Sequence, residues 1–120
     1  MSRRILVVED DPALRTLTEA VLDDAGYEPL TASNGAEALE ILREKQVQLI
    51  LLDMRMPVMD GWAFAEAYHA RPGPHAPVVV LTAAQDAQKR AKEIQAAGWI
   101  AKPFDLDHLV ATVGRLAAPM

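Results

Sequence analysis

The sequence predicts an α/β fold in which a parallel five-stranded sheet is covered by helices on both faces. Five short apolar runs alternate with five segments whose apolar residues recur at helical spacing, over a chain of 120 residues. Such alternation is typical of βα units, because a crossover helix lets consecutive strands run parallel. The length leaves room for one domain, so we expect residues 1–120 to form a single domain.

The predicted strands are short apolar runs bounded by turn-forming or charged residues. The third is apolar without interruption from Leu49 to Leu52, as expected of a strand that is buried on both faces. The last run is the weakest of the set. The five runs are Ile5–Val8, Tyr27–Thr31, Val47–Leu52, Val78–Leu81 and Trp99–Ala101.

Each predicted helix places its apolar residues on one stripe. The stripe of the first helix holds Leu14, Leu17 and Val21. The last helix carries the same spacing at Leu106, Leu109, Val113 and Leu116. The helices between them are shorter and rich in alanine, and cover Ala36–Glu44, Trp62–His69 and Gln88–Ala97.

Residues with capping chemistry mark several helix ends. Asp11 offers an N-cap that is followed by Pro12 at the first helical position. Asp60, before a glycine, begins the third helix in a similar way. Gly26 and Gly98 are expected to end helices in a left-handed conformation.

Composition and charge exclude several classes of protein. A net charge of -5 and a single basic stretch, Lys89–Lys92, argue against direct binding of nucleic acid. The chain has no cysteine, and no apolar run approaches the roughly 18 residues of a membrane span, so we expect a cytoplasmic protein without membrane contact. His69, His75 and His108 show no metal-ligand spacing and are expected at the surface.

Acidic residues follow the first and third strands. Glu9, Asp10 and Asp11 end the first strand, and Asp53 ends the third. An aspartate after a strand is often a turn former or helix cap, and capping accounts for Asp11. The first and third strands of a doubly wound sheet can be neighbours, which brings Glu9 and Asp10 beside Asp53. Carboxylates so close repel each other unless a cation neutralises them, and Mg²⁺ is the ion that best suits such oxygen ligands.

Two further strand ends carry complementary groups. Thr82 closes the fourth strand, and Lys102 follows the fifth strand immediately before Pro103. A carboxylate nucleophile, a metal ion, a hydroxyl donor and a lysine are the groups that phosphoryl transfer onto aspartate needs. The four strand ends together therefore predict phosphoryl transfer to Asp53.

Four segments at these strand ends resemble the receiver domain of two-component response regulators, in order and nearly at its spacing. They are Ile5–Pro12, Leu51–Gly61, Val80–Ala83 and Ala101–Phe104. The resemblance runs from about Arg4 to Leu116. It implies a flavodoxin-like (βα)5 fold with sheet order 2-1-3-4-5 and a cis peptide before Pro103. It also implies a signalling protein of a phosphorelay that catalyses only its own phosphorylation and dephosphorylation, and is otherwise not an enzyme.

Glu9, Asp10 and Asp53, where the first and third strands end, are called the acidic edge below. The resemblance further implies a role for each of these residues. Asp53 accepts a phosphoryl group from a histidine kinase or phosphotransfer protein. Asp10, Asp53 and the backbone carbonyl of Arg55 bind Mg²⁺, and Glu9 acts through water.

A conformational switch is implied as well. Thr82 and Lys102 contact the phosphoryl oxygens, Thr82 moves toward them, and an aromatic side chain matched here by Trp99 swings inward. Trp99 is equally well explained as a half-buried edge residue that covers the end of the sheet. The segment between Gly98 and Lys102 is shorter than the family pattern, which puts the usual interaction face beside the fifth strand in doubt.

Three other functions compete with phosphoryl transfer to Asp53. A receiver-like module could bind its partners without being phosphorylated, while keeping every site residue. A hydrolase of the haloacid dehalogenase type needs a second aspartate two residues after Asp53, where this chain has Arg55. A nucleotide binder needs a phosphate-cradling loop after the first strand, where Glu9–Asp11 would repel phosphate. Arg55 could either screen the aspartyl phosphate or steer a partner.

The expected partners follow from the implied phosphorelay. No linker-like composition follows Leu116, so we expect a stand-alone regulator rather than a piece of a longer protein. Such a regulator meets its kinase or phosphotransfer protein, and an output protein or a second copy of itself.

Overall fold

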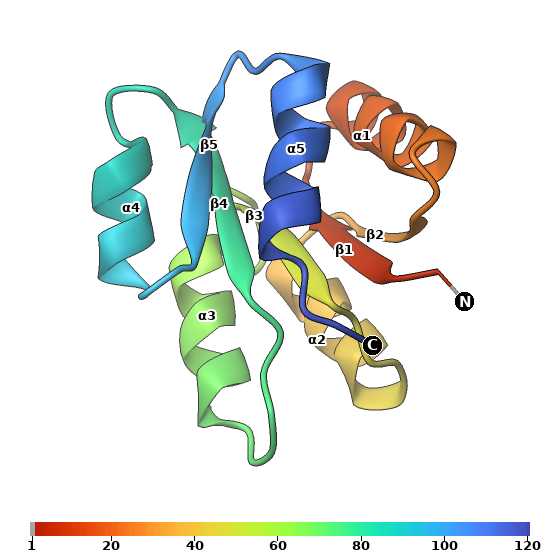
Figure 1. Cartoon of the computed structure of the whole chain (residues 1–120). Helices are drawn as coiled ribbons and strands as arrows, with labels where there is room; N and C mark the ends of the chain where they lie inside the picture. The colour runs from red at the N-terminus through yellow and green to blue at the C-terminus, as the bar shows by residue number, and fades with distance from the viewer. Residues whose placement is uncertain (1) are drawn as a thin grey trace.

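The computed structural model describes residues 2–120, in which strands and helices alternate strictly along the chain (Figure 1). The strands are β1 (Arg4–Val8), β2 (Glu28–Ala32), β3 (Leu49–Asp53), β4 (Val78–Ala83) and β5 (Gly98–Lys102). The helices are α1 (Pro12–Asp24), α2 (Gly35–Glu44), α3 (Gly61–Ala70), α4 (Ala87–Glu93) and α5 (Leu106–Leu116). The predicted α/β class is confirmed. Each helix in this range is too short or too polar to cross a membrane.

The strands form one parallel sheet in the order β2-β1-β3-β4-β5, as the resemblance implies. Val8, the last residue of β1, pairs with Leu52 of β3. Asp53 comes next in β3 and pairs with Leu81 of β4. The carboxyl ends of three neighbouring strands therefore meet at one edge, where open α/β sheets place their binding sites.

Helices cover both faces of the sheet, with α1 and α5 on one face and α2, α3 and α4 on the other (Figure 1). Successive residues of each strand point to opposite faces. Leu51 of β3 packs in the cluster that holds Leu22 of α1 and Leu109 of α5, whereas its neighbour Leu52 packs in the cluster that holds Phe64 of α3. All five side chains are fully buried, and each contributes roughly 1.5–3 kcal/mol by leaving water.

The predicted capping residues lie where the sequence places them. Asp11 Oδ1 accepts a hydrogen bond from the backbone N–H of Ala13 at 2.9 Å at the start of α1. Asp60 Oδ1 accepts one from the N–H of Ala63 at 2.9 Å at the start of α3. Gly26, with a φ of 93°, takes the left-handed conformation expected after α1.

Helix α4 ends at Glu93, four residues before the predicted end at Ala97. The residue in the left-handed conformation is Gln95, with a φ of 54°, whereas Gly98 opens β5. The prediction that Gly98 ends the helix is therefore wrong. The prediction of a shortened segment before Lys102 counted its residues from Gly98. It is wrong for the same reason, because the left-handed residue is Gln95 and three residues separate it from Trp99.

Backbone hydrogen bonds explain why α4 ends early. The N–H of Gln95 donates to the carbonyl of Lys92 at 3.3 Å, and the N–H of Ala96 donates to the carbonyl of Ala91 at 2.9 Å. These bonds form a Schellman motif, which satisfies carbonyls that the helix leaves unpaired. Ile94, just before the turn, is 7% exposed and is drawn into the core, so burial favours the reversal at this point.

Strand β3 begins two residues later than predicted. Val47 is 9% exposed, but pairing with β1 begins at Leu49, opposite Ile5. Val47 is thus buried without belonging to the strand. Its burial explains why the position is apolar, and the apolar residue led to the early predicted boundary.

Candidate functional site

Three carboxylates converge where β1 and β3 end. Glu9, Asp10 and Asp53 each offer one oxygen, and these oxygens lie within 4.8 Å of one another. Glu9 is 1% exposed and Asp53 is 7% exposed, whereas Asp10 faces solvent. The backbone N–H of Glu9 donates to the carbonyl of Ala32 at 3.0 Å, which extends the pairing of β1 with β2 and holds Glu9 in place. The predicted convergence of these side chains is confirmed.

Lys102 reaches this cluster from the end of β5. Its Nζ lies 2.9 Å from Glu9 Oε1 and 3.7 Å from Asp53 Oδ1. Thr82 is 9% exposed and pairs with Ala101, the residue before Lys102. The sheet therefore brings four strand ends to one edge. The peptide bond between Lys102 and Pro103 is cis, as the resemblance implies.

Burial and charge act together on the buried carboxylate of β3. Burial, then a hydrogen bond and the negative charge of Glu9, raise the pKa of Asp53 to about 8, although the ammonium of Lys102 opposes the rise. Burial works to lower the pKa of Lys102, but the carboxylates of Glu9 and Asp53 outweigh it and raise that pKa above its ordinary value. The ammonium and the carboxylates thus favour each other's charged forms.

The donor set of this edge fits a hard divalent cation. Glu9 Oε1 bonds to Lys102, and Glu9 Oε2 accepts the N–H of Asp11 at 3.3 Å, so Asp10 and Asp53 hold the carboxylate oxygens best placed for an ion. When all three carboxyls are ionised, they and the one ammonium leave two negative charges, the amount that one divalent cation balances. In residues 2–120 no second group of three such side chains comes as close together.

An arginine that the sequence analysis did not single out braces the acidic loop. Arg15 Nη1 donates to the carbonyl of Glu9 at 2.9 Å and lies 3.5 Å from the carbonyl of Asp10. Arg15 lies on the first turns of α1, and its backbone N–H donates to the carbonyl of Asp11 at 2.9 Å. Its position in the sequence carries no signal of this role, because the contact depends on how α1 turns back over β1.

Arg55 is held near the site by a tryptophan on α3. Its backbone N–H donates to Asp53 Oδ1 at 3.4 Å, and its guanidinium carbon lies 5.8 Å from the centre of the Trp62 ring. Arg90 of α4 lies 5.2 Å from the same ring, and Trp62 Nε1 donates to Glu93 Oε1 at 2.9 Å. Trp62 therefore connects the loop after Asp53 to α4, a link that the sequence analysis missed.

The loop between β3 and α3 is tightly constrained. Val58 has a φ of 69° and is 85% exposed, and the N–H of Met59 donates to the carbonyl of Pro57 across it at 2.7 Å. This three-residue turn is a strained one for a β-branched side chain. A Cβ on Gly61 would lie 2.7 Å from the Cα of Met54, so only glycine fits at the start of α3.

Trp99 lies on the outer strand β5 and is 44% exposed. It pairs with Val80, two residues before Thr82. The structure thus agrees with a half-buried edge residue, and the switch role of Trp99 stays a prediction.

The sheet order and the constellation at its edge match one known family. The family model for the response regulator receiver domain matches residues 5–114, nearly the whole chain. This chain belongs to that family. The receiver is 41% identical over 118 residues to the DNA-binding transcriptional regulator NtrC of Escherichia coli (strain K12), and it spans 96% of its own length but 25% of NtrC.

Other relatives and solved structures are closer in size to this receiver. Sporulation initiation phosphotransferase F of Bacillus subtilis (strain 168) is 34% identical over 111 residues, which cover 91% of this chain and 89% of that protein. Chemotaxis response regulator CheY4 of Vibrio cholerae superposes with a TM-score of 0.87 at 32% identity and covers 97% of this chain and 99% of its own.

A magnesium-bound neighbour bears on the acidic edge. The receiver domain of the sensor histidine kinase PA1611 from Pseudomonas aeruginosa PAO1 superposes with a TM-score of 0.85 at 31% identity, over 97% of this chain and 98% of that one. That structure contains a magnesium ion coordinated in its active site cleft. Receiver domains thus bind Mg²⁺ in an acidic pocket, and the carboxylates of this receiver fit such an ion.

Proposed function

We propose that this receiver accepts a phosphoryl group on Asp53 from a histidine kinase or phosphotransfer protein, with Mg²⁺ bound by Asp10, Asp53 and the carbonyl of Arg55. The observation that carries the proposal is the convergence of three carboxylates and the Lys102 ammonium at one sheet edge. Family membership supports the same function. A structural ion pair would not need three carboxylates around one lysine.

Asp53 becomes a nucleophile when it loses its proton. With a pKa raised to about 8, the carboxyl is largely protonated at neutral pH while no cation is present. Mg²⁺ held by Asp10 and Asp53 would supply positive charge that favours the carboxylate form of Asp53. One oxygen of Asp53 then bonds to phosphorus as the bond from phosphorus to the donor nitrogen breaks, and the donor imidazole keeps that electron pair.

Lys102 and Thr82 stabilise the charge that develops on the transferred group. The Lys102 Nζ lies 3.7 Å from Asp53 Oδ1, within reach of oxygens on a phosphoryl group attached there. Thr82 is the residue after Leu81, which pairs with Asp53 across the sheet. In this proposal its hydroxyl donates a hydrogen bond to another phosphoryl oxygen. We expect Lys102→Met to slow phosphorylation by roughly 100-fold, the usual effect of removing one such group.

The test is phosphorylation by a small donor. The protein is incubated with Mg²⁺ and acetyl phosphate, and its intact mass is measured. We expect one phosphoryl increment in the wild type that depends on Mg²⁺ and is lost in Asp53→Asn. The matched control is Asp60→Asn, which changes a carboxylate of the same loop to another good capping residue and should keep the increment.

Two results would count against the proposal. An increment of the same size in Asp53→Asn would place the phosphoryl group elsewhere. A folded wild type that gains no mass from acetyl phosphate, phosphoramidate or a phosphorylated histidine donor would favour a receiver that binds partners without phosphorylation. Of these two functions, phosphorylation is favoured because Asp10, Asp53, Thr82 and Lys102 are all present.

The reaction is confined to the protein itself. We propose that water later hydrolyses the aspartyl phosphate and that no external phosphoester is turned over. Arg55 stands where a hydrolase of the haloacid dehalogenase type carries a second acidic residue. This chain spans 25% of the length of NtrC. We propose that its phosphorylation controls an activity carried by another domain or by a partner protein.

A further inference from the structure

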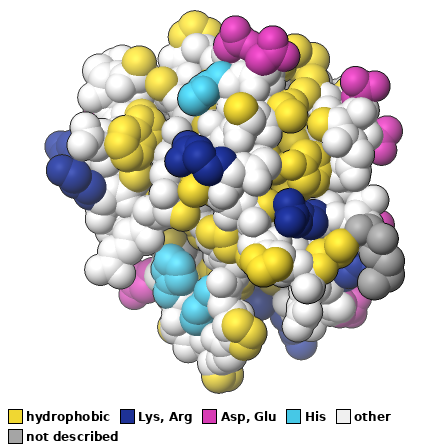
Figure 2. Space-filling view, viewed as in Figure 1, with side chains coloured by type: hydrophobic (Ala, Val, Ile, Leu, Met, Phe, Trp, Pro, Cys, Tyr) yellow, Lys and Arg dark blue, Asp and Glu magenta, His cyan; other side chains and the backbone are white. Residues whose placement is uncertain are grey.

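Two histidines lie side by side at the end of the sheet opposite the acidic site. His69 belongs to the last turn of α3, and His75 lies in the loop that leads to β4. Their ring centroids are 5.5 Å apart, with an angle of 82° between the ring planes. Figure 2 shows two adjacent histidine side chains on this part of the surface, apart from the third. Both are exposed, as predicted, and their adjacency does not follow from their spacing in the sequence.

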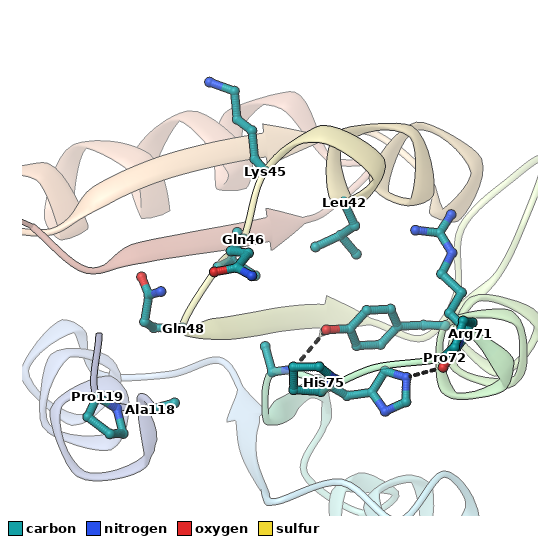
Figure 3. A pocket seen from close by; sticks show the side chains of 13 residues that line it. Leu42, Lys45, Gln46, Gln48, Arg71, Pro72, His75, Ala118 and Pro119 are labelled. Atoms are coloured by element: carbon teal, nitrogen blue, oxygen red, sulfur yellow. Dashed lines mark hydrogen bonds between the residues drawn. The ribbon is translucent and has the colours of Figure 1, made fainter.

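A backbone carbonyl determines which nitrogen of His75 holds the proton. Its Nε2 lies 2.8 Å from the carbonyl oxygen of Arg71, and a carbonyl can only accept. The Nε2 therefore carries the hydrogen and Nδ1 keeps its lone pair. Figure 3 shows this bond and the second ring nitrogen of His75 on the side away from it. Histidines that bind metals commonly donate their other N–H to a carbonyl in this way.

The loop that carries His75 is stiff before any ligand binds. Residues 71–77 contain prolines at positions 72, 74 and 77. The Tyr68 hydroxyl accepts the N–H of Ala76 at 2.7 Å, and the Tyr68 ring lies 5.0 Å from the His75 ring and 5.8 Å from the His69 ring, centre to centre. The backbone that carries His75 is therefore already ordered, which lowers the entropic cost of binding a ligand there.

The spacing of the rings suits one shared metal ion. Zinc–nitrogen bonds of about 2.0–2.1 Å at a tetrahedral angle place the centroids of two ligand imidazoles roughly 5 Å apart. The observed centroid distance of 5.5 Å is close to this value, and the His69 ring is exposed at the helix end. We propose that His69 and His75 bind one divalent transition-metal ion of the Zn²⁺ class, with water in the remaining positions.

This site is independent of the phosphoryl chemistry. It lies beside the loop that enters β4, whereas Glu9, Asp10 and Asp53 lie where strands end. Imidazole favours Zn²⁺, Cu²⁺ and Ni²⁺, while the carboxylates favour Mg²⁺. The ion joins the end of α3 to the loop and would hold one wall of the pocket drawn in Figure 3, which His75, Tyr68 and Arg71 line.

Calorimetric titration with ZnCl₂ tests the site, and excess Mg²⁺ is included to compete with Zn²⁺ for the carboxylates Glu9, Asp10 and Asp53. We expect one saturable Zn²⁺ site in the wild type that is lost in His69→Ala and in His75→Ala. The matched control is His108→Ala, which removes the chain's remaining histidine on α5 and should bind as the wild type does. Circular dichroism of each variant without Zn²⁺ establishes that it is folded.

Nitrogen NMR of the imidazoles gives a second readout that does not depend on the variants. His75 should show the Nε2–H form without metal, and Zn²⁺ should shift its Nδ1. The proposal is overturned if the wild type shows no saturable uptake, if folded His69→Ala binds Zn²⁺ as tightly as the wild type, or if Nδ1 of His75 does not respond. None of these results depends on phosphorylation of Asp53.

Discussion

The Asp53 carboxyl shows how one residue can be both costly and useful to a fold. It is 7% exposed and lies beside Glu9, so burial and like charge both oppose its ionisation. Natural selection of such an arrangement is understandable only where the charge has a task. A bound cation or a phosphoryl group turns the unfavourable cluster into a favourable one.

Replacing Asp53 by asparagine should stabilise the protein when divalent cations are absent. The folded pKa of about 8 lies above the ordinary value of 3.8, so the folded state keeps a proton that the unfolded chain has released. The contribution of Asp53 to wild-type stability should therefore be fullest below pH 3.8 and be lost as pH rises toward 8. We expect Asp53→Asn to lack this fall and to be more stable at pH 8 by more than about 1 kcal/mol.

Urea denaturation in EDTA from pH 4 to pH 9 measures the difference. Asp60→Asn, on the same loop, should follow the wild-type curve. A wild type whose stability does not fall relative to Asp53→Asn over this range would contradict the raised pKa.

Trp62 should report where the Arg55 side chain lies. A guanidinium on a partly exposed ring such as that of Trp62 gains about 0.5–1 kcal/mol, whereas a hydrogen bond from it to a phosphoryl oxygen gains about 1.5–3 kcal/mol. We expect Arg55 to leave the ring when a phosphoryl group or beryllofluoride binds at Asp53. In Trp99→Phe, which leaves Trp62 as the single tryptophan, Mg²⁺ with beryllofluoride should change the emission. Adding Arg55→Met should remove most of that change, and an equal change in both proteins would refute this movement.

At the scale of elements, the loop between β3 and α3 carries strain that its sequence does not relieve. Val58 has a φ of 69° in a three-residue turn, a conformation that β-branched residues rarely adopt. Strain next to a nucleophile persists when surrounding contacts fix the backbone. Here the N–H of Gly61 donates to the carbonyl of Met54 at 2.9 Å, and the N–H of Gly35 donates to the carbonyl of Met59 at 3.0 Å.

Replacing Val58 by glycine should raise the stability of the fold. Glycine adopts a positive φ without a steric penalty, and Val58 is 85% exposed, so little packing is lost. We expect a gain of roughly 1 kcal/mol in the free energy of unfolding, measured by urea denaturation. Val58→Ala is the matched control, because it removes the branch but keeps the Cβ, and it should recover less. A loss of stability in Val58→Gly would show that the turn is not strained.

At the scale of the whole molecule, the sheet order makes the site. Glu9, Asp53 and Lys102 are far apart in the sequence, and the order β2-β1-β3-β4-β5 brings them to one edge. The same edge concentrates negative charge in a chain whose net charge is -5. A cation that binds only this arrangement must stabilise the folded state by mass action.

Magnesium should therefore raise the melting temperature. At a Mg²⁺ concentration 100 times its dissociation constant, the folded state gains about 2.7 kcal/mol. We expect this gain in the wild type and in Asp107→Asn, an exposed carboxylate on α5, but not in Asp10→Asn. Scanning calorimetry with and without Mg²⁺ measures it. Equal shifts in Asp10→Asn and the wild type would mean that the cation binds elsewhere.

The sequence alone determined the fold class. Each strand and helix must bury an apolar face, so the spacing of its apolar residues shows which kind of element it is. It also indicated the residues at the carboxyl edge of the sheet, since Asp53, Thr82 and Lys102 directly follow apolar runs and Asp10 comes one residue after such a run. The α4 boundary escaped it because a glycine is the usual left-handed residue, whereas here Gln95 takes that conformation to satisfy a Schellman motif.

Only the tertiary structure decided which side chains meet. The contact of Arg55 with Trp62 depends on how the loop before α3 folds over that helix, and the adjacency of His69 and His75 depends on how the loop before β4 turns back. No local period encodes such contacts, because they join side chains whose separations in sequence are unrelated to their distances in space. The residue types needed for phosphoryl transfer could therefore be predicted from the sequence. The side-chain contacts around Arg55 and between the two histidines could not, because they depend on how the loops fold.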